Sequence, residues 1–277
     1  MKYQNLIINV CLTGIVPTKD VNPYVPITPK EIAQDARKVY DLGASMVHIH
    51  ARDKDGQPSS KKEIYKEIID RIRDKCEDLV IVVSTSGRRT RDIKQRMNVL
   101  ELDGYHKPDM ASLTLGSMNF KDDTGINSPE TILSLLTSMN SSGIRPELEI
   151  FDTGMANYAK YLFEKGHLEG RHYSNLILGS LGTMPATPKN LSHLVEALHE
   201  NLIWAATGVG RFAFYVQCLS LAMGGHIRVG IEDSIFMDEE KRQVATNEKL
   251  VSRIVRVAEA MGRRLGTPRD VRKMLHL

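Results

Sequence analysis

The sequence predicts an α/β fold, a single-domain (β/α)8 TIM barrel. Short runs of aliphatic and β-branched residues alternate with amphipathic helical patterns, and eight such pairs occur within 277 residues, a usual length for one barrel. No linker or low-complexity segment divides the chain, so we expect one domain over residues 1–277. A doubly wound sheet shows the same alternation, but the count of eight favours the closed barrel.

Each expected strand is a short apolar run, such as LIINVCL for the first and LVIVVST for the third. In chain order, the expected strands cover residues 6–12, 45–51, 79–85, 109–115, 147–152, 174–179, 202–206 and 226–231. The expected helices cover residues 29–42, 60–76, 88–102, 129–142, 155–165, 188–200, 209–223 and 241–264.

Residues that start and stop helices support these limits. Thr28 is a candidate N-cap, Pro29 occupies the first helical position, and Gly43 ends the first helix. The segment NSPETILSLLTSMNSSG repeats this plan for the fourth helix. The tail, GTPRDVRKMLHL, predicts one extra short helix over about residues 267–277, which either caps the barrel or contacts another subunit.

Composition excludes several classes of protein. Hydrophobic residues make up 42% of the chain and charged residues 26%, as in ordinary soluble proteins. The formal charge of +3 reflects 37 basic against 34 acidic residues, too little to indicate nucleic-acid binding but suited to anionic small molecules. No apolar stretch approaches the roughly 18 residues that span a membrane, and the N-terminus does not resemble a signal peptide. Three widely spaced cysteines argue against disulfides, so we expect a cytoplasmic protein.

The stretch MVHIHARD places two histidines, His48 and His50, on one face of the second expected strand. Each could be a core histidine whose nitrogen atoms are satisfied by neighbours. Two imidazoles side by side, followed directly by Arg52 and Asp53, also fit a metal site.

The last expected strand, in GGHIRVGIEDS, supplies a carboxylate for the same site. The chemistry of a barrel lies on the loops after its strands, and the second and eighth strands both flank the first. Glu232 can therefore reach the two histidines, which gives two His and one Glu with one position open to substrate, the usual plan of a catalytic zinc. Asp233 is free for proton transfer, and Arg228 lies on the same face as Glu232. The alternative for this stretch is a helix N-cap at Asp233 or the next residue.

Another type of zinc barrel fits the sequence less well. Amidohydrolases also use an HxH strand, but it is their first strand, and further histidines follow their fifth and sixth strands. Here the fifth expected strand ends in Glu and Asp, and His172 precedes the sixth strand. The amidohydrolase interpretation therefore fails on position.

A glycine-rich segment, GVGR (Gly208 to Arg211), opens the helix expected after strand seven. Close helix packing is one explanation for its glycines. Barrels also bind phosphate near strands seven and eight through backbone N–H groups at a helix start. Arg211 would add positive charge there, so a phosphate-bearing ligand is the second explanation.

Six segments resemble the beta-keto acid cleavage enzyme family: TGIVPTKDVNPYVPITPKEIA, GASMVHIHARDKDGQPS, VSTSG, PDMASLTLGSMNF, PELEIFDTGM and GGHIRVGIEDS. They run from the first expected strand to the last, so the resemblance covers essentially the whole chain. It implies a zinc-dependent (β/α)8 enzyme, usually a homotetramer. The implied reaction condenses a β-keto acid with acetyl-CoA and cleaves the adduct to acetoacetate and a new acyl-CoA.

The resemblance also implies a role for each matching residue. Zinc bound by His48, His50 and Glu232 would polarise the β-keto oxygen. Asp233 corresponds to the base that removes the proton between ketone and carboxylate. The other matches are the residues that orient this base, Arg228 and Glu149, and those that hold the substrate carboxylate, Ser84, Gly87 and Ser112.

The first loop departs from one pattern of the family. Members that take the amine-bearing 3-keto-5-aminohexanoate have an acidic residue two positions after a Thr-Gly pair, where this chain has Val16. Burying an unpaired ammonium against Val16 would be costly, so we expect the amino substrate not to be preferred. A neutral, apolar or hydroxylated β-keto acid would suit Val16. Arg88 or Arg89 could instead favour a second carboxylate, or both could lie on the surface of the third helix.

Two alternatives to this function remain. A metal-dependent aldolase or carbon–carbon lyase that acts on a small keto acid needs the same metal and base but no CoA. A barrel-shaped binding protein would have no use for an open zinc beside a spare Asp. For the CoA-dependent enzyme, Gly208, Gly210 and Arg211 are the expected contacts to CoA.

Overall fold

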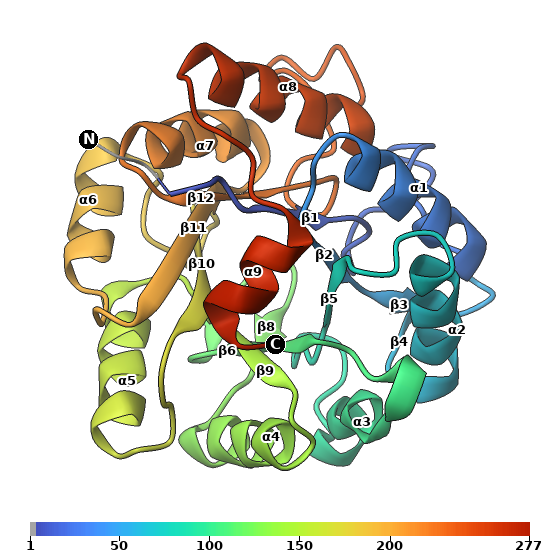
Figure 1. The fold of residues 1–277 in the computed structure, drawn as a ribbon, viewed down its shortest axis with the longest axis vertical. Helices are drawn as coiled ribbons and strands as arrows, with labels where there is room; N and C mark the ends of the chain where they lie inside the picture. Colours follow the sequence, from blue (N-terminus) through green and yellow to red (C-terminus); the bar gives the residue numbers. More distant parts are fainter. Residues whose placement is uncertain (1–3) are drawn as a thin grey trace.

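Eight parallel strands close into a barrel in the order β1-β12-β11-β10-β9-β6-β5-β2 (Figure 1). The structure, a computed structural model, describes residues 4–277. The barrel strands are β1 (Ile8–Cys11), β2 (Met46–Ile49), β5 (Val80–Val83), β6 (Met110–Thr114), β9 (Arg145–Ile150), β10 (His172–Leu178), β11 (Leu202–Gly208) and β12 (His226–Val229). Each expected strand is present, so the (β/α)8 prediction is confirmed.

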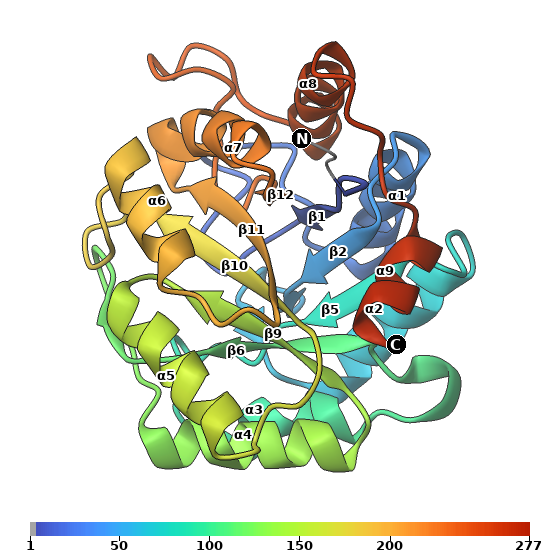
Figure 2. The same cartoon turned by 60° about the vertical axis from the view of Figure 1, so that its left-hand side comes forward.

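Helices surround the barrel, as Figures 1 and 2 show from two sides. They are α1 (Pro29–Asp41), α2 (Lys62–Arg73), α3 (Ile93–Met97), α4 (Pro129–Ser141), α5 (Thr153–Glu164), α6 (Pro188–Glu196), α7 (Ala213–Ala222), α8 (Asn247–Ala260) and α9 (Pro268–Leu275). Two hairpins interrupt the loops, β3 (Ala51–Arg52) with β4 (Pro58–Ser59) and β7 (Met118–Asn119) with β8 (Thr124–Gly125). None of the helices in the described part of the chain is long and apolar enough to cross a membrane.

The start of α1 forms as its sequence predicts. The Thr28 hydroxyl accepts the Glu31 N–H, and the Glu31 carboxylate accepts the Thr28 N–H, which together make a capping box. Gly43 follows the end of the helix with φ of +97°, a conformation that glycine adopts without strain.

The expected helix over 88–102 is wrong in its first part. Helix α3 begins only after Asp92, whose side chain accepts a hydrogen bond from the Lys94 N–H and caps the helix there. A 3-10 turn, η1 (Asn98–Glu101), then replaces the second half. Arg88 and Arg89 therefore lie in the loop after β5 and not on a helix surface.

Two other helices start later than expected, at 213 in place of 209 and at 247 in place of 241. A 3-10 turn, η3 (Gly210–Phe212), precedes α7. Helix α8 starts after Thr246, whose hydroxyl accepts the Lys249 N–H. In both places the capping or turn geometry, which the apolar pattern does not reveal, sets the first helical residue.

The barrel interior changes from apolar to polar along its axis. Because successive strand residues point to opposite faces, Val47 and Ile49 of β2 pack under the outer helices whereas Met46 and His48 face the interior. Met46 belongs to an apolar cluster at the amino-terminal end of the strands. Further along the strands, buried polar side chains replace it: Asn9, His48, Glu147, Asn175 and Arg228.

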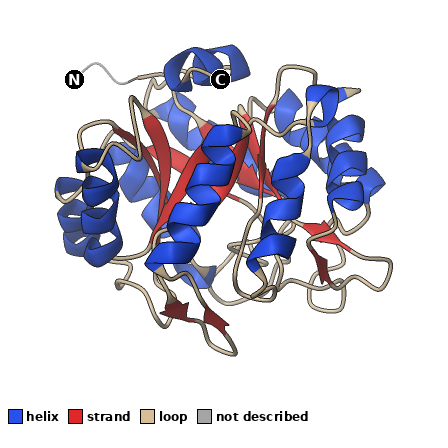
Figure 3. Ribbon diagram, turned by 90° about the horizontal axis from the view of Figure 1, so that it is seen from below, coloured by secondary structure: helices blue, strands red, loops and turns tan. Residues whose placement is uncertain are grey.

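Helix α9 caps the amino-terminal end of the barrel, one of the two placements expected for the tail. Its Val271 and Leu275 complete the inner apolar cluster. Arg272 donates two hydrogen bonds to the Asp109 carboxylate, at 2.7 and 3.1 Å. Figure 3 shows the C-terminal helix and the short hairpins at opposite ends of the barrel.

Candidate metal centre and active site

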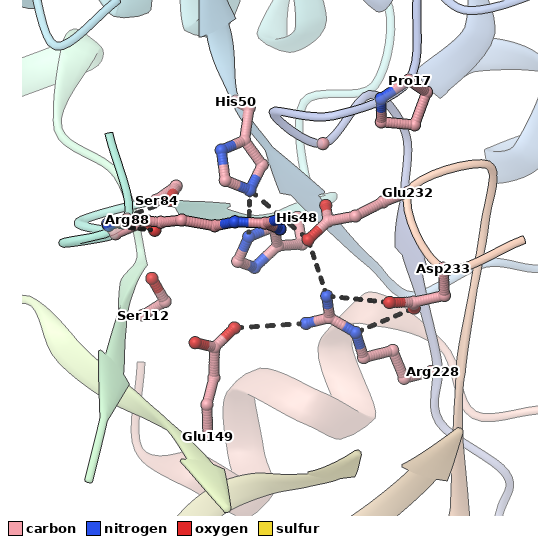
Figure 4. A network of polar contacts seen from close by, with 12 residues as sticks. Pro17, His48, His50, Ser84, Arg88, Ser112, Glu149, Arg228, Glu232 and Asp233 are labelled. Atoms are coloured by element: carbon pink, nitrogen blue, oxygen red, sulfur yellow. Dashed lines mark hydrogen bonds and ion pairs between the residues drawn. The ribbon is translucent and has the colours of Figure 1, made fainter. Parts of the chain in front are cut away.

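His48 and His50 lie together at the carboxyl end of β2, as their spacing predicts. Their Nε2 atoms are 3.2 Å apart, and both side chains are buried (Figure 4). His48 is a strand residue whose register pairs it with Cys11 of β1 and Val82 of β5. The β-sheet thus fixes the position of the first imidazole, and the second follows two residues on.

Glu232, on the loop after β12, completes a three-residue cluster. Its Oε1 atom is 3.4 Å from His50 Nε2, and one ligand atom from each of the three residues lies within 4.8 Å of the others. The second carboxylate oxygen, Oε2, is buried and has no hydrogen-bond partner in the described part of the chain. Two imidazoles and a carboxylate with an unsatisfied buried oxygen suit a divalent metal ion such as zinc.

Glu147 of β9 is a residue of the site that the sequence analysis missed. Its Oε2 atom is 2.7 Å from His48 Nδ1, and its Oε1 atom accepts a hydrogen bond from Asn9 at 2.6 Å. A carboxylate on Nδ1 fixes the imidazole orientation and leaves Nε2 for a metal. The alternation in ELEIFD could have revealed it, since Glu147 and Glu149 share one strand face.

The carboxylates around the histidines favour positive charge at this point. Burial opposes charge on His48, but Glu147 and Glu232 outweigh it and raise the pKa of His48 to about 9. At His50 burial prevails and lowers the pKa. Burial opposes ionisation of Glu232 as well, but the two histidines and Arg228 keep its pKa well below the usual range. The site therefore presents an ionised carboxylate beside imidazoles held for a cation.

Arg228 of β12 connects the acidic groups around this centre. Its guanidinium donates to Asp233 Oδ2 at 3.0 Å and to Glu232 Oε1 at 2.8 Å. It also contacts Glu149 Oε1 at 3.4 Å, and Glu149 in turn accepts the Thr114 hydroxyl at 2.6 Å. The side chain is 2% exposed, so three carboxylates surround a fully desolvated cation (Figure 4). This network holds Asp233 in one orientation beside the metal ligands.

Asp233 has the electrostatic setting of a proton acceptor. Burial raises the pKa of its carboxyl to about 6. The positive charge of Arg228 lowers this pKa, but the negative charge of Glu232 partly cancels that effect. A carboxylate with a raised pKa is a stronger base than an exposed one. Its side chain caps no helix, so the N-cap alternative for Asp233 is wrong: the next helix, α8, starts after Thr246.

A cavity of about 310 Å³ lies beside this centre. Its lining includes Arg228, Glu232, Asp233, His50 and Glu149. Its remaining lining includes Thr114 at the end of β6 and residues from the loops after β1, β5 and β6, among them Val16, Ser84, Gly87, Arg88 and Phe120. A cavity of this size holds a small organic substrate.

Ser84, Gly87 and Ser112, the residues matched to carboxylate binding, occupy different positions. Ser84 and Gly87 line the cavity. Ser112 is not among the lining residues: it is buried, and its hydroxyl accepts the Thr85 N–H at 3.1 Å. A Cβ at Gly87 would lie 2.6 Å from the Ile126 carbonyl oxygen, so close packing of the loop requires glycine there.

Val16 and the two arginines of STSGRR also take distinct places. Val16 is 52% exposed and lines the mouth of the cavity. Arg88 lines the same cavity, whereas Arg89 is not among its lining residues and pairs with Asp123 at 3.4 Å.

The GVGR segment separates the first cavity from a second one of about 570 Å³. Gly210 and Arg211 line the second cavity. Gly208 is buried, and a Cβ there would lie 2.4 Å from the Phe212 carbonyl oxygen, so packing explains this glycine. Gly208 ends β11, and the 3-10 turn η3 (Gly210–Phe212) occupies the place where the start of a helix was expected.

Comparisons with known proteins agree with this architecture and site. The model of the beta-keto acid cleavage enzyme family matches residues 5–277. The 3-keto-5-aminohexanoate cleavage enzyme of Fusobacterium nucleatum is 36% identical over 275 residues, covering 99% of this chain and 98% of the relative. The 3-oxoadipate:acetyl-CoA acetyltransferase of Cupriavidus necator is 32% identical over 277 residues, covering 99% and 95%.

A solved structure shares the fold. The structure titled "Apo structure of ObcA" superposes with a TM-score of 0.82 at 20% identity, over 92% of this chain and 66% of that one. About a third of that longer chain therefore has no counterpart here. The family model and the two relatives span nearly the whole sequence, and the chain belongs to the beta-keto acid cleavage enzyme family.

Proposed function

We propose that this enzyme condenses a β-keto acid with acetyl-CoA and cleaves the adduct to acetoacetate and a new acyl-CoA, with zinc in the site. One observation carries the proposal: the buried Asp233, oriented by Arg228, lines the same cavity as His50 and Glu232, two members of a three-residue cluster that could hold a metal ion. Relatives named as keto acid:acetyl-CoA transferases support the same reaction class.

His48, His50 and Glu232 would hold the metal, with Glu147 fixing the orientation of His48. A zinc ion bound there would act as a Lewis acid on the substrate ketone and stabilise its enolate. Three protein ligands are the usual number at a catalytic zinc.

Asp233 would take the proton from the carbon between the ketone and the carboxylate. Arg228 holds the Asp233 carboxylate through two nitrogen atoms, at 3.0 and 3.4 Å, and is itself held by Glu149. Ser84 and Gly87 would bind the substrate carboxylate at the cavity wall. Ser112 of β6 would act indirectly: its hydroxyl accepts the Thr85 N–H and so positions the loop that carries Ser84 and Gly87.

The bond changes balance without a redox cofactor. The enolate carbon attacks the acetyl-CoA thioester, a carbon–carbon bond forms, and CoA leaves as a thiolate. The thiolate adds to the original ketone carbon of the adduct. Cleavage of the bond between that carbon and the former enolate carbon then releases acyl-CoA. The proton held by Asp233 returns to the acetoacetate carbanion.

CoA would approach past the GVGR turn. Gly210 and Arg211 line the second cavity, and Val209, the residue before them in the chain, lines the first. Arg211 is exposed and can pair with a CoA phosphate. Gly208, buried under Phe212, would support the turn without contacting CoA.

Val16 would make the amine-bearing substrate less preferred. Its apolar side chain offers no partner to an ammonium at the cavity mouth. Arg88, which lines the same cavity, would repel the ammonium.

We also expect a homotetramer in the cytoplasm. Light scattering of the purified protein would test the assembly.

The decisive assay measures acetoacetate formation by zinc-loaded protein with acetyl-CoA and a panel of β-keto acids. The panel includes amino, neutral, hydroxylated and dicarboxylic side chains. Acetoacetate from non-amino members, with little from the amino one, supports the reaction and the role of Val16. Loss of substrate without acetyl-CoA, and no acetoacetate from any member, would instead indicate a simple carbon–carbon lyase.

A further inference from the structure

Arg88 lies on the wall of the substrate cavity, in the loop between β5 and α3. Its side chain is half-buried and points toward the centre of the site (Figure 4). The central carbon of its guanidinium lies over the Phe120 ring, 4.0 Å from the ring centroid. This contact holds the guanidinium against a side chain that lines the same cavity.

This guanidinium has no polar or oppositely charged partner within residues 4–277. It forms no hydrogen bond or ion pair there, and its Nε atom is buried without a hydrogen-bond partner. The two nearby acids do not satisfy it: Asp123 pairs with Arg89 at 3.4 Å, and Asp122 is exposed on the rim. Arg228, by contrast, is neutralised by three carboxylates.

The loop that carries Arg88 is held in place by Arg96. Arg96 is 4% exposed and donates to the Thr85 carbonyl oxygen at 2.8 Å and to Asn127 at 2.6 Å. Its Nη1 atom would lie 2.7 Å from a Cβ at Gly87, so the loop packs directly on it. Arg88 therefore projects from a fixed backbone, which a residue that discriminates between substrates requires.

An always-charged, partly desolvated guanidinium favours an anionic ligand. Its fork of N–H donors matches a carboxylate with two parallel hydrogen bonds. The substrate's reacting carboxylate is assigned above to Ser84 and Gly87. The part of the substrate left for Arg88 is the end of its side chain, next to apolar Val16.

We propose that Arg88 is a specificity-determining residue that selects β-keto acids with a second, distal carboxylate. The inference rests on the proposed function for the reaction, and on Arg88 alone for the selectivity. Lys121, exposed on the same cavity, adds a second positive charge at the mouth. The acyl-CoA product then carries the distal carboxylate, and the reaction that consumes it must accept a dicarboxylic acyl-CoA.

The test compares 3-oxoadipate with 3-oxohexanoate, which has the same chain length and no second carboxylate. Wild-type enzyme should have the higher kcat/KM for 3-oxoadipate. Arg88→Gln should lower that value about 10- to 100-fold and change the value for 3-oxohexanoate less than about threefold, because only the charged pair is lost. Arg89→Gln, next in the chain but paired with Asp123, is the matched control and should leave both values unchanged.

Three outcomes would overturn the inference. An equal loss with both substrates would mean that Arg88 binds the reacting carboxylate. A raised KM for acetyl-CoA with unchanged selectivity would assign Arg88 to CoA. A wild-type preference for 3-oxohexanoate would rule out an ion pair between Arg88 and a distal carboxylate.

Calorimetric binding without acetyl-CoA separates this inference from the reaction. If the wild-type enzyme binds 3-oxoadipate more tightly than 3-oxohexanoate, and Arg88→Gln abolishes the difference, the selectivity holds even when no acetoacetate forms. If acetoacetate forms but the binding difference is absent, the reaction stands and Arg88 is not the selector.

Discussion

Buried histidines occur at both ends of the barrel, and their surroundings differ. At the amino-terminal end, His226 Nδ1 accepts the Ile7 N–H at 3.0 Å, and burial together with Arg263 lowers its pKa to about 3. At the carboxyl end, His48 and His50 face Glu147 and Glu232. A buried histidine with a backbone N–H partner stays neutral and belongs to the scaffold. One surrounded by carboxylates is prepared for a cation.

The two ends also differ in what covers them. Helix α9 closes the amino-terminal end with apolar contacts and the Arg272–Asp109 pair. The carboxyl end keeps a cavity, an unpaired Glu232 oxygen and an unpaired Arg88. We infer that substitutions at one end change stability and those at the other change chemistry, and four predictions test this division.

Asp233→Asn should have the largest effect. Asn keeps an oxygen for Arg228 but cannot accept the substrate proton, so kcat should fall about 100- to 10,000-fold. Steady-state kinetics on zinc-loaded protein measure it, with metal content and unfolding temperature as controls. A fall of less than tenfold would show that another group is the base.

Leu275→Ala should lower the free energy of unfolding by about 2–5 kcal/mol, because it leaves a void beneath α9. The Leu275 side chain is buried there. Urea unfolding measures the change. Activity well below the unfolding midpoint should stay at the wild-type level, and the exposed Lys273→Ala serves as the control. Lost activity in folded Leu275→Ala would break the division between the ends.

Glu147→Gln should weaken metal binding about 10- to 100-fold, since Gln cannot supply the negative charge that orients and polarises His48. Competition with a chelator of known affinity measures the metal dissociation constant directly. Glu164→Gln, on the exposed side of α5, is the matched control. Equal affinity in both variants would reduce Glu147 to a packing role.

His226 should make the scaffold acid-sensitive, the smallest of the four effects. Its folded pKa of about 3 lies below the ordinary value of 6.5, so the unfolded chain binds a proton that the folded chain excludes. Stability is therefore full above pH 6.5 and falls as the pH drops, by about 1 kcal/mol between pH 7 and 5.5 for this group. Urea unfolding at both pH values should show a smaller loss in His226→Asn, and an equal loss would contradict the assignment.

Much of the fold was predictable because local patterns agree with the barrel. Apolar runs at regular spacing predicted all eight strands, and Thr28 with Pro29 predicted the start of α1. The helix expected over 88–102 failed because Asp92 caps a later start, and the helical composition of the preceding residues concealed this loop. That error left two alternatives open for Arg88, entry into the substrate pocket or a place on the surface of the expected helix.

The site was predictable in part for a similar reason. Residues two positions apart on a strand share one face, so His48 and His50 had to lie together. Glu232 was predictable because β12 and β2 both neighbour β1. Glu147 was missed because its role depends on β9 lying across the barrel from β2, and the two residues are separated by 99 positions. Side-chain direction alone does not reveal which interior groups meet.

The sequence by itself determined the fold class, the family and the set of candidate metal ligands, because these depend on periodicity and on motifs within single segments. Only the tertiary structure decided that Glu147 supports His48, that Arg228 joins three carboxylates, and that Arg88 turns into the cavity while Arg89 pairs with Asp123. The physical reason is that burial and pairing arise where distant strands converge. The chemistry of each charged group is set by those neighbours and not by its neighbours in the chain.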